Sequence, residues 1–405
     1  MNRRKERIVI VGAGLAGLRA AERFRELGFA GDLVMVGAER HRPYHRPALS
    51  KQFLAGDLGS RDLTFHGAAD LDARWFLGRT VRRLDPRRHL VQIGHAKPLR
   101  YDGLVIATGV RARRPADTPD DPRVRTLRTR DDAEMLQRLL RAGDGPCVIL
   151  GGGFTASELA STLAERGRDV VLASRSPTLL GALGPEAGQA ALRLHQDHGV
   201  RVWLDTTVRH WVPGEWGVGL HFTNGQFVVA GSVVLGVGGE PDTAWLAGSG
   251  VDISDGVLCE RTCHVAGIPD AVAAGDVARW PVRPGYPPRR IEHWLNAVEM
   301  GRAAARNLLF GRAAAIPFEP LPRFWSEQYG ERFQAAGFLG PAATRVSLEG
   351  DLANGPGVLG YCEEGLLVGV VAREDPRAML RWTARLDHRL AQRGGRHRLA
   401  EALTA

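Results

Sequence analysis

The stretch RIVIVGAGLAGLRAAERFRELG, residues Arg7–Gly28, decides the fold of this chain. Arg7–Gly12 is typical of an apolar strand, and Leu15–Gly28 has helical periodicity. The turn between them carries Gly12, Gly14 and Gly17, and Asp32–Gly37 follows as a second strand. Such glycines let backbone amides approach a pyrophosphate at a helix N-terminus, where unpaired N–H groups favour anions. The stretch therefore predicts a βαβ unit that binds a dinucleotide.

The same order of elements recurs in the middle of the chain. A strand over Cys147–Leu150 leads into Gly151-Gly152-Gly153, a helix over Phe154–Gly167 and a strand over Asp169–Ala173, with Ala156 in place of the third glycine. Two βαβ units require parallel strands with helical crossovers. One unit implies one dinucleotide, so two units imply that two dinucleotides meet.

The remaining segments suggest three domains, because 405 residues exceed what one hydrophobic core organises. Their expected elements are a strand with a tight turn at Leu99–Gly109, a linker at Pro115–Pro122, a small antiparallel sheet over Val200–Val234, a short strand at Ala271–Asp276, a helix over Glu292–Phe310 and a strand pair near Val358–Val371. The predicted domains are 1–114 with 240–315, then 115–239, then 316–405, which ends in a basic tail.

Composition narrows the partners and the compartment. The formal net charge of +9 favours acidic partners, although arginine-rich genome composition explains it equally well. No basic stripe with interleaved aromatics points to nucleic acid. No apolar run reaches about 18 residues, so no membrane segment is expected, and the basic start leads into a strand rather than a signal-peptide core. We expect a cytoplasmic protein.

The four cysteines do not suggest a redox disulfide. They are Cys147, Cys259, Cys263 and Cys362, without a CxxC pair and without a CxxxxC after the first glycine turn. A disulfide relay needs two thiols close to the bound dinucleotide, so this pattern argues against the disulfide-relay branch of proteins with two dinucleotide-binding units. Cys259, Cys263 and His264 lack a fourth ligand, so no metal site is expected.

Two positions bear on the ribose groups of the dinucleotides. Glu39 lies 22 residues after Gly17, where a carboxylate can accept ribose hydroxyls, or it is a solvated loop residue. In the second βαβ unit, Ser174 and Arg175 follow the second strand, at the place where an acidic residue would select NADH. Serine and arginine suit a 2′-phosphate, which favours NADPH; the alternative is a surface arginine at a strand end.

Five further segments carry a family resemblance. Pro43–Lys51 (PYHRPALSK) resembles the PYxRPxLSK signature of oxygenase-coupled ferredoxin reductases. Without this resemblance, the run would be interpreted as a solvated surface turn. In chain order, the other matches are Leu127-Arg128-Thr129 before Asp132-Ala133, Ala274–Ala278 (AGDVA), Arg290–Gly301 (similar to RxExWxNAxxxG) and Pro322–Tyr329 (similar to FWSDQY). The chain thus resembles the FAD-dependent ferredoxin, rubredoxin and putidaredoxin reductases, whose fold is like that of glutathione reductase.

The resemblance implies an α/β fold with two Rossmann-like dinucleotide-binding domains of the three-layer ββα type and a C-terminal α+β domain. The first domain would bind FAD and the second NAD(P)H. Lys51 would contact the flavin near N5 and Glu158 would pair with Lys51, both as catalytic residues; alternatively Glu158 is an ordinary first-turn helix acid. Trp294 and Trp325 would border the isoalloxazine or nicotinamide, or simply pack in the core.

The remaining site residues follow from the same resemblance. Arg128 would reach the FAD phosphates or adenine, and Asp276 would accept a ribityl hydroxyl. The expected cofactor-binding residues are Gly12, Gly14, Ala16, Gly17, Glu39, Arg46, Lys51, Val81, Ala107, Thr108, Gly109, Arg128, Asp276, Trp294, Gly151, Gly153, Ala156, Ser174 and Arg175.

The implied reaction carries electrons from NAD(P)H through FAD to an acidic iron–sulfur ferredoxin that serves an oxygenase. Departures from the family pattern at Gly151–Glu158, Gly238–Asp242 and Ala372–Pro376 cluster around the nicotinamide half. They motivate an alternative, a flavoprotein that oxidises a small substrate with altered nicotinamide use. A non-catalytic flavoprotein that binds partners through its charge, as apoptosis-inducing factor suggests, is a third possibility.

Overall fold

The computed structural model describes residues 6–65, 67–68, 70–283 and 285–391. Its residues group into two compact units. The first unit comprises Met1–His45, Arg61–Arg111 and Glu240–Pro322, and the second comprises Arg46–Ser60, Ala112–Gly239 and Arg323–Ala405. The three-domain division remains a prediction, and Lys51, expected in the FAD-binding domain, is grouped here with Glu158.

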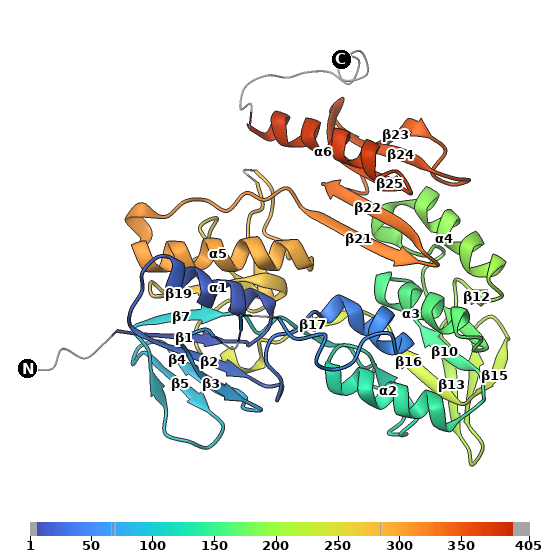
Figure 1. Cartoon of the computed structure of the whole chain (residues 1–405), viewed down its shortest axis with the longest axis horizontal. Helices are drawn as coiled ribbons and strands as arrows, with labels where there is room; N and C mark the ends of the chain where they lie inside the picture. Colours follow the sequence, from blue (N-terminus) through green and yellow to red (C-terminus); the bar gives the residue numbers. More distant parts are fainter. Residues whose placement is uncertain (1–5, 66, 69, 284, 392–405) are drawn as a thin grey trace, which may run out of the picture. The chain divides into compact units, whose positions relative to one another are not determined.

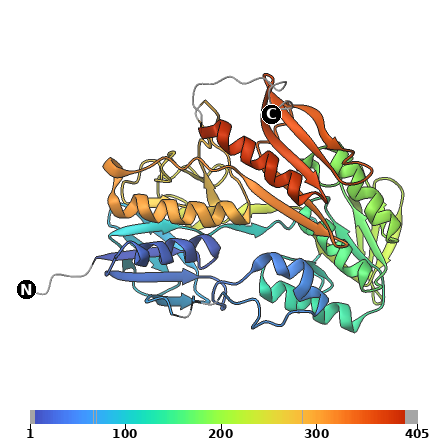
Figure 2. The same cartoon turned by 45° about the horizontal axis from the view of Figure 1, so that its top comes forward.

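The first unit is built on a five-stranded parallel sheet in the order β19-β7-β1-β2-β3. Helices α1 and α5 pack against each other on one face of this sheet (Figures 1 and 2). An antiparallel sheet of β4, β5 and β6 completes the unit. The bounds are β1 (Arg7–Val11), α1 (Leu15–Glu26), β2 (Asp32–Gly37), β3 (Arg74–Leu77), β4 (Val81–Asp85), β5 (Leu90–Ile93), β6 (Leu99–Arg100), β7 (Gly103–Ile106), β18 (Val257–Leu258), β19 (Ala271–Ala273), β20 (Ala278–Arg279) and α5 (Trp294–Phe310), with short helical turns η4 (Ala244–Leu246), η5 (Gly275–Val277) and η6 (Arg312–Ala314).

The second unit repeats this plan. Its parallel sheet has the order β12-β11-β10-β16-β9, and β13, β14 and β15 form an antiparallel sheet. The bounds are η1 (Arg46–Ala48), η2 (Leu49–Phe53), β9 (Val124–Thr126), α2 (Arg130–Ala142), β10 (Cys147–Leu150), α3 (Phe154–Glu165), β11 (Val170–Ala173), η3 (Gly181–Leu183), α4 (Pro185–Asp197), β12 (Arg201–Trp203), β13 (Val208–Pro213), β14 (Val218–Phe222), β15 (Phe227–Ala230) and β16 (Ser232–Leu235). A two-stranded pair joins β8 (Val110–Ala112) and β17 (Gly239–Pro241).

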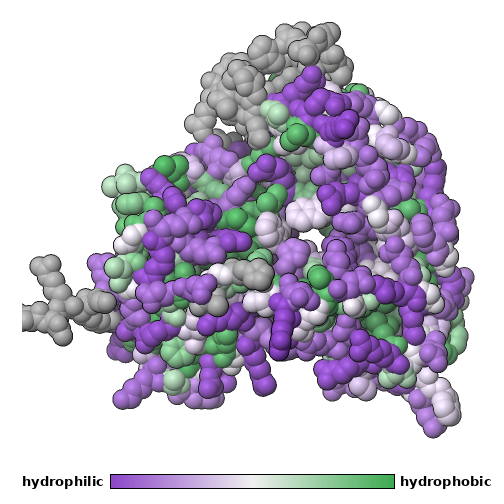
Figure 3. All heavy atoms as spheres, in the orientation of Figure 1, coloured by the Kyte–Doolittle hydropathy of each residue, from purple (hydrophilic) through white to green (hydrophobic). Residues whose placement is uncertain are grey.

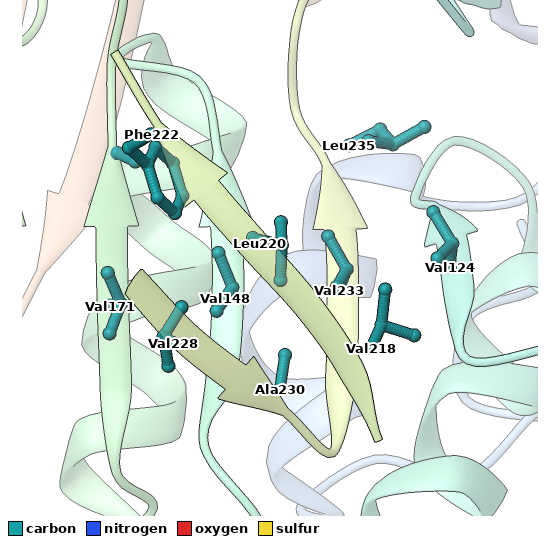
Figure 4. Close-up of a cluster of buried hydrophobic side chains, with 11 residues drawn as sticks. Val124, Val148, Val171, Val218, Leu220, Phe222, Val228, Ala230, Val233 and Leu235 are labelled. Carbon is teal, nitrogen blue, oxygen red and sulfur yellow. The ribbon is translucent and has the colours of Figure 1, made fainter. Parts of the chain in front are cut away.

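A hydrophobic core of the second unit lies between its parallel sheet and the sheet of β13, β14 and β15. Figure 4 shows Val148, Val171 and Val233 of the parallel sheet facing Leu220 and Val228 of the antiparallel one. Helix α3 packs against β10 and β11, so the layers are sheet, sheet and helix. β-Branched residues suit this interface because their stiff side chains interdigitate between pleated surfaces.

The last part of the second unit is an antiparallel sheet with one helix. The strand order is β21-β22-β25-β24-β23, and α6 covers one face through contacts with β22 and β25 (Figure 2). The bounds are β21 (Arg323–Gln328), β22 (Glu331–Gly337), β23 (Thr344–Gly350), β24 (Gly357–Glu363), β25 (Leu366–Arg373) and α6 (Pro376–Ala391). The predicted strand pair near Val358–Val371 is confirmed as β24 and β25.

Two sequence-based assignments were wrong in detail. Leu99–Gly109 holds two strands, because β6 pairs antiparallel with β5 whereas β7 pairs parallel with β1. The chain turns between them at Asp102, whose carboxylate accepts the Arg7 N–H at 2.8 Å. Within Val200–Val234, only the central strands form the antiparallel sheet, since β12 and β16 join the parallel one.

The first glycine of each turn is fixed by backbone that approaches it closely. Gly12 has φ +115°, and a Cβ added there would lie 2.0 Å from the Ala107 carbonyl oxygen. Gly151 has φ +134°, and its Cβ would lie 2.2 Å from the Gly236 carbonyl oxygen. The same contact, between a glycine after the first strand and the end of its neighbour, therefore occurs in both units.

This contact makes a stability prediction for a matched pair of glycines. Gly151→Ala should lower the free energy of unfolding by roughly 3 kcal/mol, because it combines unfavourable backbone with overpacking. Gly153→Ala should cost less than about 1 kcal/mol, since nothing lies within 4 Å of a Cβ there. Urea and thermal unfolding of both variants would measure the difference, and equal losses would contradict the assignment.

Candidate functional site

The N-terminus of α1 forms a cradle for an anion. Gly14 caps this helix without a side-chain hydrogen bond among the described residues, and its first turn contains no acid. A Cβ at Gly14 would meet nothing within 4 Å, whereas one at Gly17 would lie 2.0 Å from the Gly12 carbonyl oxygen. The turn is thus closed on its inner side and open at the helix end, which fits the pyrophosphate of FAD.

The segment after β7, Ala107–Gly109, lies against this cradle, since a Cβ at Gly12 would lie 2.0 Å from the Ala107 carbonyl oxygen and 2.7 Å from the Thr108 nitrogen. The Ala107 N–H donates to the Val11 carbonyl at 2.7 Å. Thr108 Oγ1 donates to the Asp242 carbonyl at 2.7 Å, and the Asp242 N–H donates to the Gly109 carbonyl at 3.0 Å. Burial raises the pKa of the Asp242 carboxyl, an effect that Arg111 partly opposes. An acid of the segment Gly238–Asp242, which departs from the family pattern, therefore lies beside the cradle.

Other expected FAD ligands also belong to the first unit. Glu39 follows β2, and its carboxylate accepts a hydrogen bond from Tyr44 Oη at 2.6 Å, so it is not a freely solvated loop residue. Asp276 lies in η5, which approaches α1 closely, since a Cβ at Gly275 would lie 2.9 Å from that of Ala16. Trp294 begins α5.

Two of these residues lie against other parts of the first unit. The Trp294 ring contacts His45 edge-to-face, with centroids 6.1 Å apart. Val81 begins β4, which packs against η4.

The second cradle has the same construction at the start of α3. Gly153 caps this helix without a side-chain hydrogen bond among the described residues, and the first turn has no acid. Ala156, which replaces the third glycine, is buried. It packs against Gly236, the residue directly after β16, since a Cβ at Gly236 would lie 3.0 Å from the Ala156 Cβ. The missing glycine on the helix is thus compensated by a glycine on the facing strand, and the close approach is preserved.

Ser174 and Arg175 follow β11 beside this second turn. A Cβ at Gly152 would lie 2.5 Å from Ser174 Oγ, so the serine lies directly on the glycine turn. Ser174 is buried, and its hydroxyl accepts the Ser176 N–H at 3.1 Å. Arg175 is exposed. The arginine is therefore the group of the two that is available to a ligand in solution.

From Arg46 onward, the PYHRPALSK segment forms irregular helical turns that belong to the second unit. Arg46 donates a hydrogen bond to the Arg128 carbonyl. The adjacent capping box of α2 fixes Arg128, since its N–H donates to Asp132 at 3.0 Å. Lys51 lies at a kink in the widened turn η2, with φ −124° and ψ −110°. Such widened turns are frequent at functional positions.

Lys51 and Glu158 form the ion pair that the sequence predicted. Lys51 Nζ lies 2.8 Å from Glu158 Oε2, and the side chains are 14% and 9% exposed. Ser50 Oγ donates to the same carboxylate oxygen at 2.8 Å. Glu158 stands beyond the first turn of α3, which contains no acid, so the alternative reading as a first-turn helix acid was wrong.

The second oxygen of Glu158 binds the start of the C-terminal sheet. Ser326 Oγ donates to Oε1 at 3.1 Å, and the Glu327 N–H approaches the same atom at 3.4 Å. Sequence reasoning missed Ser50 and Ser326 as members of this site. Both nevertheless stand inside the motifs that carried the resemblance, one beside Lys51 and the other beside Trp325, which is half-buried in β21.

Four donors therefore surround one buried carboxylate. A buried charge is tolerated only when it is paired and its remaining lone pairs accept hydrogen bonds, and Glu158 meets both conditions. In return, this ion pair holds the Lys51 ammonium in one place. The arrangement can present a fixed cation to a ligand on which negative charge develops.

The cysteines of this chain are not arranged for redox chemistry. All four cysteines are buried free thiols, and burial raises the pKa of Cys147 to about 11 and that of Cys259 to about 12. Across the described ranges, no three His, Cys, Asp or Glu side chains are grouped to hold a metal ion.

No helix in the described part has the length and hydropathy of a membrane span. Polar side chains dominate the face shown in Figure 3.

Residues 6–301 match the sequence pattern of the family described as pyridine nucleotide-disulphide oxidoreductase. The chain belongs to this family. The 3-phenylpropionate/cinnamic acid dioxygenase ferredoxin–NAD(+) reductase component of Photorhabdus laumondii is 33% identical over 93% of this chain and 95% of its own length. The anthranilate 1,2-dioxygenase system ferredoxin–NAD(+) reductase component of Burkholderia cepacia is 34% identical over 90% of both.

A solved structure supports the same family. The covalent putidaredoxin reductase–putidaredoxin complex contains a chain that superposes with a TM-score of 0.88 at 26% identity, covering 95% of this chain and 93% of that one. These matches confirm the sequence-based family, the two-dinucleotide α/β fold and the assignment as an oxidoreductase.

The donor arrangement around Glu158 predicts a specific loss of stability. Glu158→Gln should lower the free energy of unfolding by about 2 kcal/mol or more, because it leaves the largely buried Lys51 ammonium unpaired. Glu165→Gln, on the exposed end of the same helix, should change it by less than about 0.5 kcal/mol. Urea unfolding monitored by tryptophan fluorescence would compare them, and indistinguishable variants would refute a structural role for the ion pair.

Proposed function

We propose that this protein passes electrons from NAD(P)H to an iron–sulfur protein that serves an oxygenase. It is proposed to be an FAD-dependent ferredoxin–NAD(P)(+) reductase, and two of its relatives are named as ferredoxin–NAD(+) reductase components of dioxygenase systems. The observation that carries the proposal is the pair of glycine cradles, each open at a helix N-terminus, together with the buried Lys51–Glu158 pair. FAD, when bound, accepts a hydride and releases electrons singly.

The chain's own residues supply binding and electrostatics. Amides at the start of α1 bind the FAD pyrophosphate, and Glu39, already oriented by Tyr44, accepts ribose hydroxyls. Lys51 supplies positive charge to the flavin and Glu158 keeps that charge in place. None of the four buried cysteines forms a disulfide, so the flavin is the exit point for electrons.

The nicotinamide cofactor is proposed to be NADPH. Arg175 is exposed beside the second cradle, and no carboxylate occupies its strand end to repel a 2′-phosphate. The partner is proposed to be an acidic ferredoxin, because the net charge of +9 steers acidic proteins toward this chain. We also propose that it works in the cytoplasm, and that neither nucleic acid nor a membrane is a partner.

One observation favours a second candidate, a flavoprotein that oxidises a small substrate. Asp242, a half-buried acid whose pKa is raised by burial, lies beside the first cradle in the segment Gly238–Asp242, which departs from the family pattern. In the same short segment, the Glu240 carboxylate forms an ion pair with the Arg111 guanidinium, with the nitrogen and oxygen 3.4 Å apart. A weakly acidic carboxyl at this place could serve as a base toward a substrate.

Anaerobic mixing separates the two candidates. The yellow protein should bleach rapidly with NADPH, and then reduce an added ferredoxin or cytochrome c at a rate that falls as salt increases, because exposed charges are screened. Stopped-flow absorbance at the flavin band would measure both steps. Failure to bleach with either NADPH or NADH would rule out the reductase and leave the small-substrate oxidase.

The choice of NADPH is tested at one residue. Arg175→Ala should lower kcat/KM for NADPH by about tenfold or more while changing that for NADH by less than about twofold, because only NADPH offers a phosphate. Arg166→Ala, an exposed arginine at the opposite end of α3, is the matched control and should change neither value. Equal kcat/KM for the two nucleotides in the wild-type protein would show that the Ser174–Arg175 argument is wrong.

A further inference from the structure

The net positive charge of this chain is concentrated in one segment of the first unit. Residues 79–100 carry seven basic side chains and one acidic side chain, a net charge of +6, whereas the whole chain has +9. They form β4, β5 and β6 together with the two turns between these strands. Six exposed cations of this segment make up a basic face: Arg82, Arg83, Arg87, Arg88, Lys97 and Arg100.

The alternation of side chains along the strands places these cations in solvent. Leu84, Val91 and Ile93 are buried, so they point toward the core. Arg83 precedes Leu84, and Arg100 follows the residue that pairs with Val91, so both arginines point to the opposite, solvent side. The two turns between the strands add three further cations of the basic face.

The cations of the basic face are unpaired. None of their side chains forms an ion pair with another described residue. Asp85, the acid of the segment, is half-buried and accepts the Arg88 backbone N–H at 3.2 Å, which closes the turn after β4. Elsewhere in the first unit arginines do pair, since Arg7 and Arg74 both bind the carboxylate of Asp32. An arginine-rich composition does not explain why the unpaired cations gather on one sheet.

The folded state gains nothing from this arrangement. Like charges on neighbouring strands repel one another, and an excess of one sign destabilises the compact state. Charged side chains can also protect the edge strands of a sheet from pairing with another chain. That role suits Arg83 on β4 and Arg100 on β6, which are the two edge strands, but not the cations in the turns. A partner that neutralises the whole face accounts for both groups.

The chemistry of the face favours carboxylates as that partner's charges. Arginine guanidinium groups bind carboxylates with two parallel hydrogen bonds. Residues 79–100 contain no Phe, Tyr or Trp on which the bases of a nucleic acid could stack. The turns at 86–89 and 94–98 carry no large apolar side chain that could insert into a membrane.

We infer that the basic face docks a protein with a carboxylate-rich surface. The sheet of β4, β5 and β6 lies on the side of the parallel sheet opposite α1 and α5 (Figures 1 and 2). The contact is therefore separate from the cradle at the start of α1. It goes beyond the proposed electron transfer, because the protein alone makes it and no cofactor takes part. Its cations are exposed, so the interaction weakens as salt increases.

Binding of fluorescein-labelled poly-L-glutamate to the FAD-bound protein, followed by fluorescence anisotropy, tests this surface. The wild-type protein should bind the polymer, with an affinity that falls as sodium chloride is added. The triple variant Arg83→Glu/Arg87→Glu/Arg100→Glu should bind about tenfold or more weakly, because each substitution replaces an attraction with a repulsion.

The matched control is Arg138→Glu/Arg141→Glu/Arg209→Glu, which changes three exposed arginines of the second unit. It has the same net charge as the first triple variant. Its affinity for poly-L-glutamate should fall by less than about threefold, because only the long-range attraction changes.

A second variant separates docking from folding. Arg83→Gln/Arg87→Gln/Arg100→Gln should keep or raise the melting temperature, because it removes repulsion between like charges without breaking an ion pair. It should still weaken the binding of poly-L-glutamate. A lower melting temperature with unchanged binding would show that these arginines serve the fold and would overturn the inference.

Three further results would overturn it. They are an absence of poly-L-glutamate binding at low salt, an equal loss of affinity in the two glutamate triple variants, and tighter binding of duplex DNA or of phosphatidylserine–phosphatidylcholine vesicles at the same salt concentration. The last result, if abolished by the Arg83 triple variant, would assign the face to a phosphate-bearing polymer or surface. Failure of the proposed function looks different, because NADPH and NADH then do not bleach the flavin while poly-L-glutamate still binds.

Discussion

The carboxylate of Glu158 is the point on which this site depends. It accepts hydrogen bonds from Ser50 and Lys51 through one oxygen and from Ser326 through the other. These donors come from segments separated by more than a hundred residues in the chain. If the carboxylate were absent, each donor would be a buried polar group without a hydrogen-bond partner, which lowers stability. A single charge thus fixes a helix, an irregular loop and the first strand of the C-terminal sheet to one another.

The glycine turns show how one design is used twice with different solutions. In both units, the first glycine has positive φ and touches the end of the neighbouring strand. In the second unit the third glycine is an alanine, and Gly236 on the facing strand supplies the missing space. The departure from the usual glycine pattern is therefore compatible with the same close packing of helix against sheet.

The sequence predicted most of the fold because strands and helices of both βαβ units have strong periodicity and clear glycine turns. It also predicted the Lys51–Glu158 pair through a resemblance. It did not reveal Ser50 or Ser326, since a serine carries no periodic signal and the carboxylate that both bind lies far away in the chain. The two strands within Leu99–Gly109 were predicted as one because β6 has only two residues and ends just before the turn at Asp102.

We propose that Glu158 holds the Lys51 ammonium where it acts on the flavin. The most direct measurement is the midpoint potential of the bound FAD in Lys51→Met, with exposed Lys97→Met as the control. Loss of a cation that stabilises the reduced flavin should lower the potential by about 30 mV or more, since about 30 mV corresponds to a tenfold change in a two-electron equilibrium. An unchanged potential in Lys51→Met would contradict the account.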